Sequence, residues 1–245
     1  MTNRNAPTEA VEPNLGRRNL RQFFDLADHI DRAEGLVAYS RYHQVMRDLA
    51  DAYDSTLPRT LAAFCALSPN NDYVGNLRST ASVLAGVKDG VDPGDIVVST
   101  YKHCRDRAYQ YATGEAQFLG HARGPKIRAF YRNILDPHDW EPVTIDGHMK
   151  AAFEGKPLTM KEAIVRSARE YDVIANETRR LANRLGLLPN QLQAIIWFAR
   201  KRVLRIKFEP QISLFARTDD LWATLVSPSE VPPFPFETRA MEAAQ

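Results

Sequence analysis

Apolar residues recur every three or four positions along most of this chain, which is the spacing of one face of an α-helix. The pattern is clear in two N-terminal segments, which carry Leu20, Phe23, Phe24, Leu26 and Ala27, and Leu36, Val37, Tyr39, Tyr42, Val45 and Leu49. Alternation of β-branched residues, typical of a strand, is short everywhere except over Val203–Phe208. The sequence therefore predicts an all-α fold, a bundle of about nine helices in two lobes.

Proline, glycine and capping residues indicate where individual helices begin and end. Thr159 and Glu162 have the spacing of a capping box, which predicts that the longest helix of the chain begins there and runs to about Leu185. Gly186 ends this helix, and Pro189 opens the last helix of the core. Shorter helices are predicted over residues 58–66 and 72–87 and around residues 101–108.

The two ends of the chain differ in composition from its middle. Residues 1–14 are rich in Asn, Pro, Thr and Glu, and residues 227–245 contain prolines at positions 228, 232, 233 and 235. Such segments bury too little apolar surface to order their backbone. We therefore expect a disordered tail over residues 1–14, a helical domain of two lobes over residues 15–226, and a proline-rich tail over residues 227–245.

Composition excludes several classes of protein. Two cysteines, Cys65 and Cys104, are too few for a disulfide framework or a four-thiolate zinc site. The six histidines show no metal-ligand spacing, so we expect neither a metal nor another cofactor. No stretch approaches the roughly eighteen apolar residues of a membrane span, and the N-terminus lacks the apolar core of a signal peptide. We expect a cytoplasmic protein with no membrane partner.

Basic residues are unevenly distributed although the formal net charge is only +2, from 32 Lys and Arg against 30 Asp and Glu. Between positions 105 and 132 only Asp106 and Glu115 oppose a first run, which consists of Arg105, Arg107, Arg123, Lys126, Arg128 and Arg132. A second run contains Arg200, Lys201, Arg202, Arg205 and Lys207. Each run fits either a surface that contacts phosphates or an ordinary solvated helix face.

One acidic residue stands where a helix is predicted to begin. In the segment Val143-Thr144-Ile145-Asp146-Gly147-His148-Met149, the apolar Val143 and Ile145 anchor the backbone just before Asp146. Unpaired backbone N–H groups at a helix start favour the ionised form of a carboxylate. The pattern fits a poised catalytic carboxylate, and it also fits an ordinary N-cap aspartate.

Three segments in this order resemble the helix-hairpin-helix DNA glycosylases of the endonuclease III and adenine glycosylase type. They are Ala66-Leu67-Ser68-Pro69-Asn70-Asn71, Gly124-Pro125-Lys126, and the segment around Asp146, and the resemblance spans residues 57–153. It implies an enzyme that flips and excises a damaged or modified base of duplex DNA, working as a monomer. A modified base of a phage or bacterial genome is among the substrates that it suggests.

The resemblance also assigns roles to individual residues. Asp146 matches the aspartate that stabilises the sugar cation, and Lys126 matches the lyase lysine of bifunctional members. It implies DNA contacts from Arg123, Gly124, Arg128, Arg132 and His148, and a base pocket formed by Asn70, Asn71 and Trp140. The family's iron–sulfur cluster needs four cysteines, which this chain does not have.

Several assignments keep an alternative. Lys126 also fits a lysine that contacts a phosphate or is merely solvated, and the Asn70-Asn71 pair also fits a simple turn. The family's hairpin reads Leu-Pro-Gly-Val-Gly, whereas residues 119–124 here read Leu-Gly-His-Ala-Arg-Gly. A non-catalytic DNA-binding protein that kept the fold is therefore one alternative to an enzyme. A helical scaffold with no role on DNA is the other.

Overall fold

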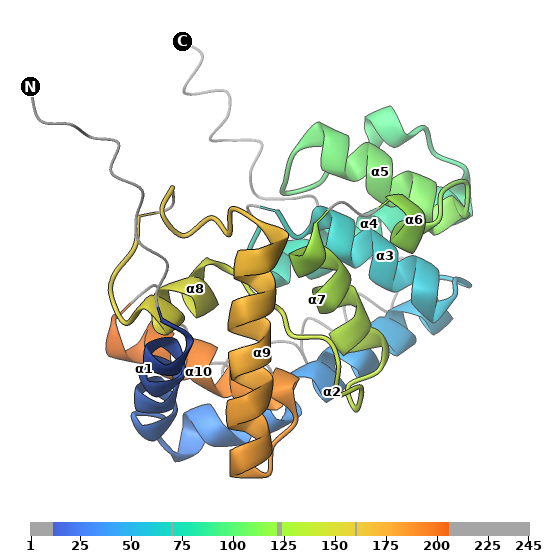
Figure 1. Cartoon of the computed structure of the whole chain (residues 1–245). Coiled ribbons are helices and arrows are strands. Elements are labelled where there is room, and N and C mark those ends of the chain that lie inside the picture. The colour runs from blue at the N-terminus through green and yellow to red at the C-terminus, as the bar shows by residue number, and fades with distance from the viewer. Residues whose placement is uncertain (1–11, 70, 122–123, 160, 206–245) are drawn as a thin grey trace, which may run out of the picture. The chain divides into compact units, whose positions relative to one another are not determined.

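The computed structural model describes residues 12–69, 71–121, 124–159 and 161–205. Within these residues the chain forms ten α-helices and one short 3-10 helix, and no strand (Figure 1). The predicted all-α class is therefore confirmed for this part of the chain. Within these residues the chain divides into two compact units, the first formed by residues 12–41 and 124–205 and the second by residues 42–121.

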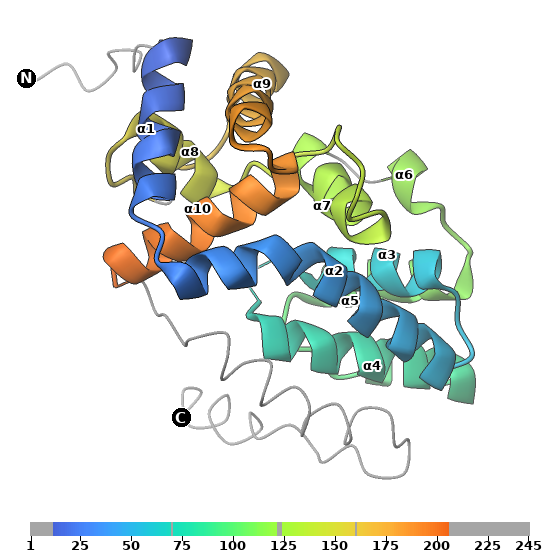
Figure 2. The same ribbon diagram turned by 90° about the horizontal axis from the view of Figure 1, so that it is seen from below.

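The first unit is built around helices from both ends of the described chain. It contains α1 (Pro13–Asp25), the first part of α2 (His29–Ala52), α7 (Pro125–Leu135), α8 (Gly147–Glu154), α9 (Ala168–Leu185) and α10 (Pro189–Val203). Helix α1 packs against α8, α9 and α10, and these helices lie together in both views (Figures 1 and 2). Its hydrophobic core includes Leu20, Ile145, Met149, Ile174, Leu192 and Ile196.

Helices α2 and α10 approach each other closely where a glycine removes the side chain. A Cβ atom on Gly35 of α2 would lie 2.6 Å from the backbone nitrogen of Ile195 and 2.8 Å from its Cα. Both distances are below van der Waals contact, and backbone atoms cannot move aside as a flexible side chain can. Only glycine therefore allows this crossing.

The second unit is centred on α3 (Leu57–Leu67), which packs against both α4 (Tyr73–Asp89) and α5 (Lys102–Thr113). The unit also contains the 3-10 helix η1 (Pro93–Asp95) and the short helix α6 (Phe118–His121). Leu61, Phe64 and Leu77 are buried in its core. The predicted helices at 58–66 and 72–87 are confirmed, each to within a residue or two of its predicted ends.

The prediction that the longest helix begins at Thr159 is wrong. Thr159 and Glu162 do exchange capping hydrogen bonds, with Thr159 N donating to Oε2 of Glu162 at 2.8 Å. The chain nevertheless forms only a turn there, because the carbonyl of Ile164 accepts a hydrogen bond from the buried Lys150 Nζ at 2.8 Å. Helix α9 begins at Ala168, nine residues after Thr159. Helix α2 is the longer of the two, with 24 residues against 18.

A second set of capping contacts starts α9. The hydroxyl of Ser167 accepts a hydrogen bond from Glu170 N at 3.1 Å, and Glu170 Oε2 accepts one from Arg166 N at 2.6 Å. The Glu170 side chain also pairs with Lys150 Nζ at 2.8 Å. The segment before α9 is therefore fastened to α8 by Lys150. The predicted end is confirmed, since Gly186 follows α9 in the left-handed conformation with φ of 66°.

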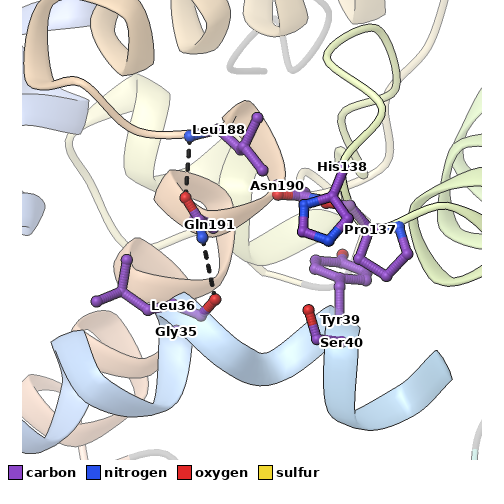
Figure 3. Close-up of a pocket in the computed structure, with 9 residues that line it drawn as sticks. All are labelled: Gly35, Leu36, Tyr39, Ser40, Pro137, His138, Leu188, Asn190 and Gln191. Atoms are coloured by element: carbon purple, nitrogen blue, oxygen red, sulfur yellow. Dashed lines mark hydrogen bonds between the residues drawn. The ribbon is translucent and has the colours of Figure 1, made fainter. Parts of the chain in front are cut away.

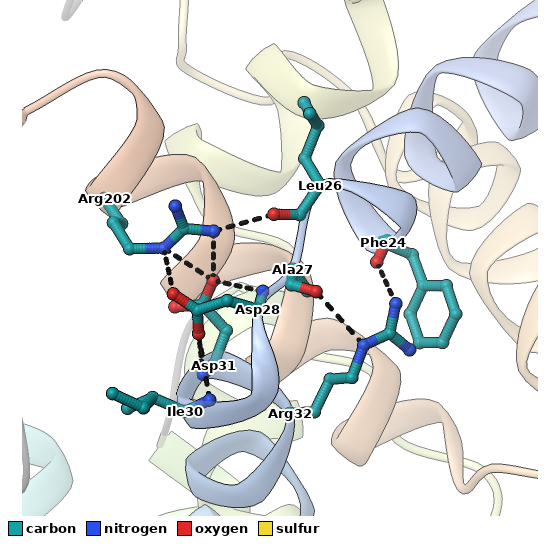
Figure 4. A network of polar contacts seen from close by, with 8 residues as sticks. All are labelled: Phe24, Leu26, Ala27, Asp28, Ile30, Asp31, Arg32 and Arg202. Carbon is teal, nitrogen blue, oxygen red and sulfur yellow. Dashed lines mark hydrogen bonds and ion pairs between the residues drawn. The ribbon is translucent and has the colours of Figure 1, made fainter.

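An ion-pair network fixes the corner between α1 and α2 to the end of α10 (Figure 4). Arg202 donates from Nε and Nη2 to Oδ2 of Asp31, at 2.9 and 2.7 Å, and from Nη2 to the carbonyl of Leu26 at 2.7 Å. Its Nε also lies 3.1 Å from Asp28 Oδ2. Asp31 is only 1% exposed, so Arg202 neutralises a carboxylate that has left water.

The predicted tails fall mostly on residues that the structure does not describe. Residues 1–11 and all of the expected C-terminal tail lie outside the described ranges, and so does half of the possible strand at Val203–Phe208. At the N-terminal boundary α1 begins at Pro13, so residues 13 and 14 are helical rather than part of a tail. Val203 closes α10. Within the described ranges, none of the helices has the length and apolar content needed to span a membrane.

Candidate functional site

A short extended segment leads into α8, and buried side chains hold each of its residues. The hydroxyl of Tyr171 on α9 donates to the carbonyl of Val143 at 2.6 Å and accepts from the backbone nitrogen of Ile145 at 3.2 Å. Between them, Thr144 accepts a hydrogen bond from the buried Asn133 amide at 2.9 Å. The backbone before Asp146 therefore has one fixed path.

Asp146 caps the start of α8, which confirms that it stands at a helix N-terminus. Its Oδ1 accepts a hydrogen bond from Met149 N at 2.9 Å, and the residue is half-buried. The other carboxylate oxygen, Oδ2, makes no hydrogen bond to any residue within the described ranges. The geometry agrees with a structural N-cap and leaves one oxygen for another partner, so the catalytic role stays a prediction.

Basic side chains from α10 meet α8 beside Asp146. The guanidinium of Arg200 donates from Nη1 to Nδ1 of His148 at 2.7 Å, although Arg200 is only 5% exposed. Lys201 places its Nζ 4.2 Å from the centre of the Trp197 ring, a cation–π contact. The His148 ring meets the same tryptophan edge to face at 5.9 Å. We refer to Asp146, His148, Trp197, Arg200 and Lys201 as the α8–α10 cluster.

The charges of this cluster act on one another. Burial lowers the pKa of His148, the Asp146 carboxylate opposes that effect, and the positive charges of Arg200, Lys201 and Lys126 lower the pKa further. Burial also lowers the pKa of Arg200 and of Lys201, and the charge of Asp146 again opposes it. The His148 imidazole is therefore neutral at neutral pH. Asp146 is the carboxylate whose charge acts on Arg200 and Lys201.

Lys126 lies in the same neighbourhood of the first unit. Its side chain is exposed in the first turn of α7. The N-cap of this helix is Gly124, which has a φ of 92°. Such a positive φ favours glycine, so the Gly-x-Lys spacing does correspond to a helix start. The charge of Lys126 reaches His148 two residues beyond Asp146. Lys126 therefore acts on the segment that carries Asp146 through its charge, but no hydrogen bond or ion pair joins Lys126 to Asp146 within the described ranges.

The other predicted DNA contacts lie along α7 and the loop that follows it. Arg128 is exposed, and Arg132 is exposed but pairs with Asp139 Oδ2 at 2.8 Å. Trp140 is 40% exposed rather than part of the core. Arg123 lies outside the described residues. Arg128, Arg132 and Trp140 all have the exposure that a contact with DNA requires, but Arg132 already pairs with Asp139.

The asparagines predicted for the base pocket belong to the second unit. Asn71 donates to the carbonyl of Leu67 at 3.2 Å and accepts from the Ser99 hydroxyl at 2.9 Å. Both ends of its amide therefore hold the chain after α3 in place, as in the turn that the sequence offered as the alternative. Asn70 is outside the described residues. A role for either in reading a base stays a prediction.

The sequence did not identify Trp197, Arg200 or Lys201 as site residues. The basic run around Arg200 was visible, but solvation and phosphate contact were equally compatible with it. Trp197 and Lys201 are four residues apart, so helical spacing alone predicts that their side chains meet. No comparable signal links Arg200 to His148, because 52 residues separate them.

A small pocket in the first unit is too narrow for a ligand. It lies between α2, the start of α10 and the loop after α7, where Pro137 and His138 stand (Figure 3). Its volume of about 10 Å³ suits a single water molecule. Asn190 donates to the carbonyl of Pro137 at 2.8 Å, while its buried Oδ1 lacks a partner within the described part of the chain. A bound water there would satisfy that oxygen.

The described residues contain no group of three or more histidine, cysteine, aspartate or glutamate side chains arranged to hold a metal ion. Burial raises the pKa of the Cys65 thiol well above its usual range, and Cys104 is also buried with a raised pKa. Neither thiol is therefore activated as a nucleophile. The charged groups of the α8–α10 cluster and Lys126 are the best candidates for chemistry in this part of the chain.

Comparison with known proteins places the chain in a family without assigning it an activity. No curated protein and no solved structure matches it. A family model matches residues 3–204, most of the chain. The chain therefore belongs to DUF7178, a family of unknown function.

Proposed function

We propose that this protein is a DNA glycosylase-like enzyme that excises a damaged or modified base, with Asp146 stabilising the sugar cation. The observation that carries the proposal is the position of Asp146. It is fixed at the N-terminus of α8 with one oxygen outside the cap, and it interacts electrostatically with Arg200, Lys201 and the neutral imidazole of His148. The resemblance to helix-hairpin-helix glycosylases supports the same role.

The proposed reaction breaks the bond between C1′ of the sugar and the base nitrogen. The electron pair of that bond leaves with the base, and positive charge develops on the sugar. A carboxylate held beneath the ring stabilises this charge without moving, because its position was fixed before the reaction. Water then adds to C1′, its hydroxyl stays on the sugar, and its proton ends on the released base.

Two features of the site favour this chemistry. The Asp146 side chain interacts electrostatically with Arg200 and Lys201, and a carboxylate is a group that stabilises a developing cation. The clamp by Tyr171 and Asn133 fixes the segment that carries Asp146, so the carboxylate is preorganised. In a bifunctional enzyme the amine of Lys126 would attack C1′ in place of water and form a Schiff base.

The test is base release by Asp146→Asn on a panel of duplexes that contain damaged or modified bases, with abasic sites revealed by heat and alkali. Asparagine is also a good N-cap, so the fold should persist. We expect retained DNA binding and a loss of base release of roughly a hundredfold or more. Unchanged base release on a substrate that the parent protein processes would remove Asp146 from the mechanism.

Asp72 provides a matched control. It is an N-cap aspartate like Asp146, accepting a hydrogen bond from Gly75 N at 2.6 Å at the start of α4 in the second unit. Asp72→Asn changes the same chemical group in the same structural role, so base release should stay at the parent level. Lys126→Ala on the same substrates decides between water and amine. Only a bifunctional enzyme loses borohydride trapping of the Schiff base in this variant.

A non-catalytic DNA-binding protein is the second candidate. The hairpin segment, residues 119–124, has its first glycine, Gly120, displaced relative to the glycosylase hairpin, while the positive side chains near α8 persist. Retention on DNA that weakens with salt, without base release from any duplex of the panel, would favour this function.

A further inference from the structure

Three consecutive basic residues of α10 point in three directions. Successive residues of an α-helix are rotated by about 100°, so neighbouring side chains leave the helix at different angles. Arg202 turns to Asp31 and Asp28, Arg200 turns to His148, and Lys201 lies over the ring of Trp197. Of these three residues, Arg202 is therefore neutralised by carboxylates, whereas Arg200 and Lys201 belong to the α8–α10 cluster.

The two cations of the cluster lack an acidic partner in direct contact. Within the described ranges, no carboxylate lies within ion-pair distance of Arg200 or Lys201. Asp146 influences both through space, but its Oδ1 is used by the helix cap. Lys126 adds a further positive charge nearby. Within the described ranges, the charges that act on His148 are therefore those of three cations and one carboxylate.

Such an excess is costly in a partly buried place. A guanidinium that is 5% exposed has given up most of its water, and buried charges are normally paired. Arg200 Nη1 has instead the neutral Nδ1 of His148, which must accept the hydrogen bond because a guanidinium only donates. The ring proton of His148 then resides on Nε2. The ring thus offers one N–H donor beside the two cations.

We propose that Arg200, Lys201 and His148 form a binding site for a phosphate group. Two cations and an N–H donor match the charge and several acceptor oxygens of phosphate, and guanidinium groups suit its geometry. The phosphate comes either from a nucleic-acid backbone or from a free phosphate monoester. A nucleic-acid backbone as the source rests on the proposed function, in which this phosphate adjoins the flipped nucleotide. A free phosphate monoester as the source does not depend on the proposed function.

The experiment measures binding of inorganic phosphate to the full-length protein by equilibrium dialysis, at ionic strength held constant with sodium chloride. NMR of the His148 ring protons, assigned with His148→Gln, reports whether the ligand occupies this site. We expect a saturable shift of the His148 resonances with phosphate. Acetate at equal ionic strength should cause none, and an equal response to acetate would overturn a phosphate site.

Variants of the two cations test the residues themselves. Lys201→Gln should weaken phosphate binding by about tenfold, the loss of one charge-assisted contact. Arg200→Lys keeps the buried charge, so this variant is expected to fold. It removes the planar guanidinium, so it should also weaken phosphate binding. Arg184→Gln, which removes a charge from an exposed position at the end of α9, is the control and should bind as the parent does. Unchanged affinity in Lys201→Gln would refute the site.

A single-stranded oligonucleotide without a target base separates the two sources. If it shifts the His148 resonances, with or without a response to inorganic phosphate, the site takes a backbone phosphodiester. If only inorganic phosphate shifts the His148 resonances, the site binds a free phosphate. The phosphate site is then supported, but its link to the proposed function is refuted. If neither does, the site is refuted. Asp146→Asn with phosphate binding intact and base release unchanged would instead refute only the glycosylase chemistry.

Discussion

The hydroxyl of Tyr171 is the atom on which the path of the chain into α8 depends most. It satisfies a backbone acceptor, the carbonyl of Val143, and a backbone donor, the nitrogen of Ile145, and all three residues are buried. Tyr171→Phe keeps the ring and removes only this oxygen. Two buried backbone groups then lose their partner, while the surrounding apolar packing stays as it was.

The magnitude follows from the cost of unsatisfied buried groups. Each backbone donor or acceptor left without a partner costs about 1–3 kcal/mol. The two groups lie one residue apart, so a single water molecule that entered could satisfy both and would reduce the total. We therefore expect Tyr171→Phe to lower the free energy of unfolding by about 2–4 kcal/mol.

The assay is urea unfolding at pH 7.5, followed by the circular dichroism of the helices. Tyr101→Phe is the control, because Tyr101 is 51% exposed and loses only a hydroxyl at the surface. That variant should change the free energy of unfolding by no more than about 0.5 kcal/mol. If Tyr171→Phe were as mild as the control, the hydroxyl would not hold the segment, and the preorganisation of Asp146 would lose its main support.

Alkaline pH supplies an independent check. Burial raises the pKa of Tyr171 from 10.0 to about 12, so the folded protein holds this proton more tightly than the unfolded chain. The resulting contribution to stability is complete below about pH 10 and is lost as pH rises toward about 12, a change on the order of 2–3 kcal/mol. Phenylalanine has no such proton. The stability difference between the parent protein and Tyr171→Phe should therefore shrink over this range.

Two further substitutions test how the first unit is packed. Gly35→Ala places a methyl group 2.6 Å from the backbone of Ile195, so we expect urea unfolding to show a free energy of unfolding lower by at least about 3 kcal/mol. The control is Gly120→Ala, which should not destabilise the protein because the space around Gly120 is open. Arg202→Met leaves the buried Asp31 carboxylate without its partner and should cost about 2–4 kcal/mol at pH 7; a loss under about 0.5 kcal/mol would show that solvent already screens the pair.

Helix ends in this chain were predictable where one residue determines them. Gly186 follows α9 with φ of 66°, a conformation that glycine adopts without a steric penalty, and the sequence predicted that end correctly. The start of the same helix was wrong because two capping boxes follow each other. Thr159 forms the first, but Lys150 takes the carbonyl of Ile164 that a continuing helix needs. A contact across 14 residues decided between two locally equivalent starts.

The candidate site was predictable to the same extent. The apolar pair before Asp146 and the glycine after it predicted a helix start, and the structure places Asp146 at that start. Whether its carboxylate only caps or also acts on a substrate depends on its surroundings, which come from another part of the chain. Arg200 and Lys201 reach that neighbourhood from α10, and no local pattern joins them to α8.

The basic run of α10 shows why charge counting alone could not separate function from stability. Arg200 and Arg202 carry the same charge two residues apart, yet the first is buried against a neutral histidine and the second, which is half-buried, pairs with a buried aspartate. Removing Arg202 strands a negative charge, so its loss should appear in unfolding. Removing Arg200 relieves an excess of positive charge, so its loss should appear in anion binding more than in stability. Identical side chains thus differ in role because the helix rotates them toward different partners.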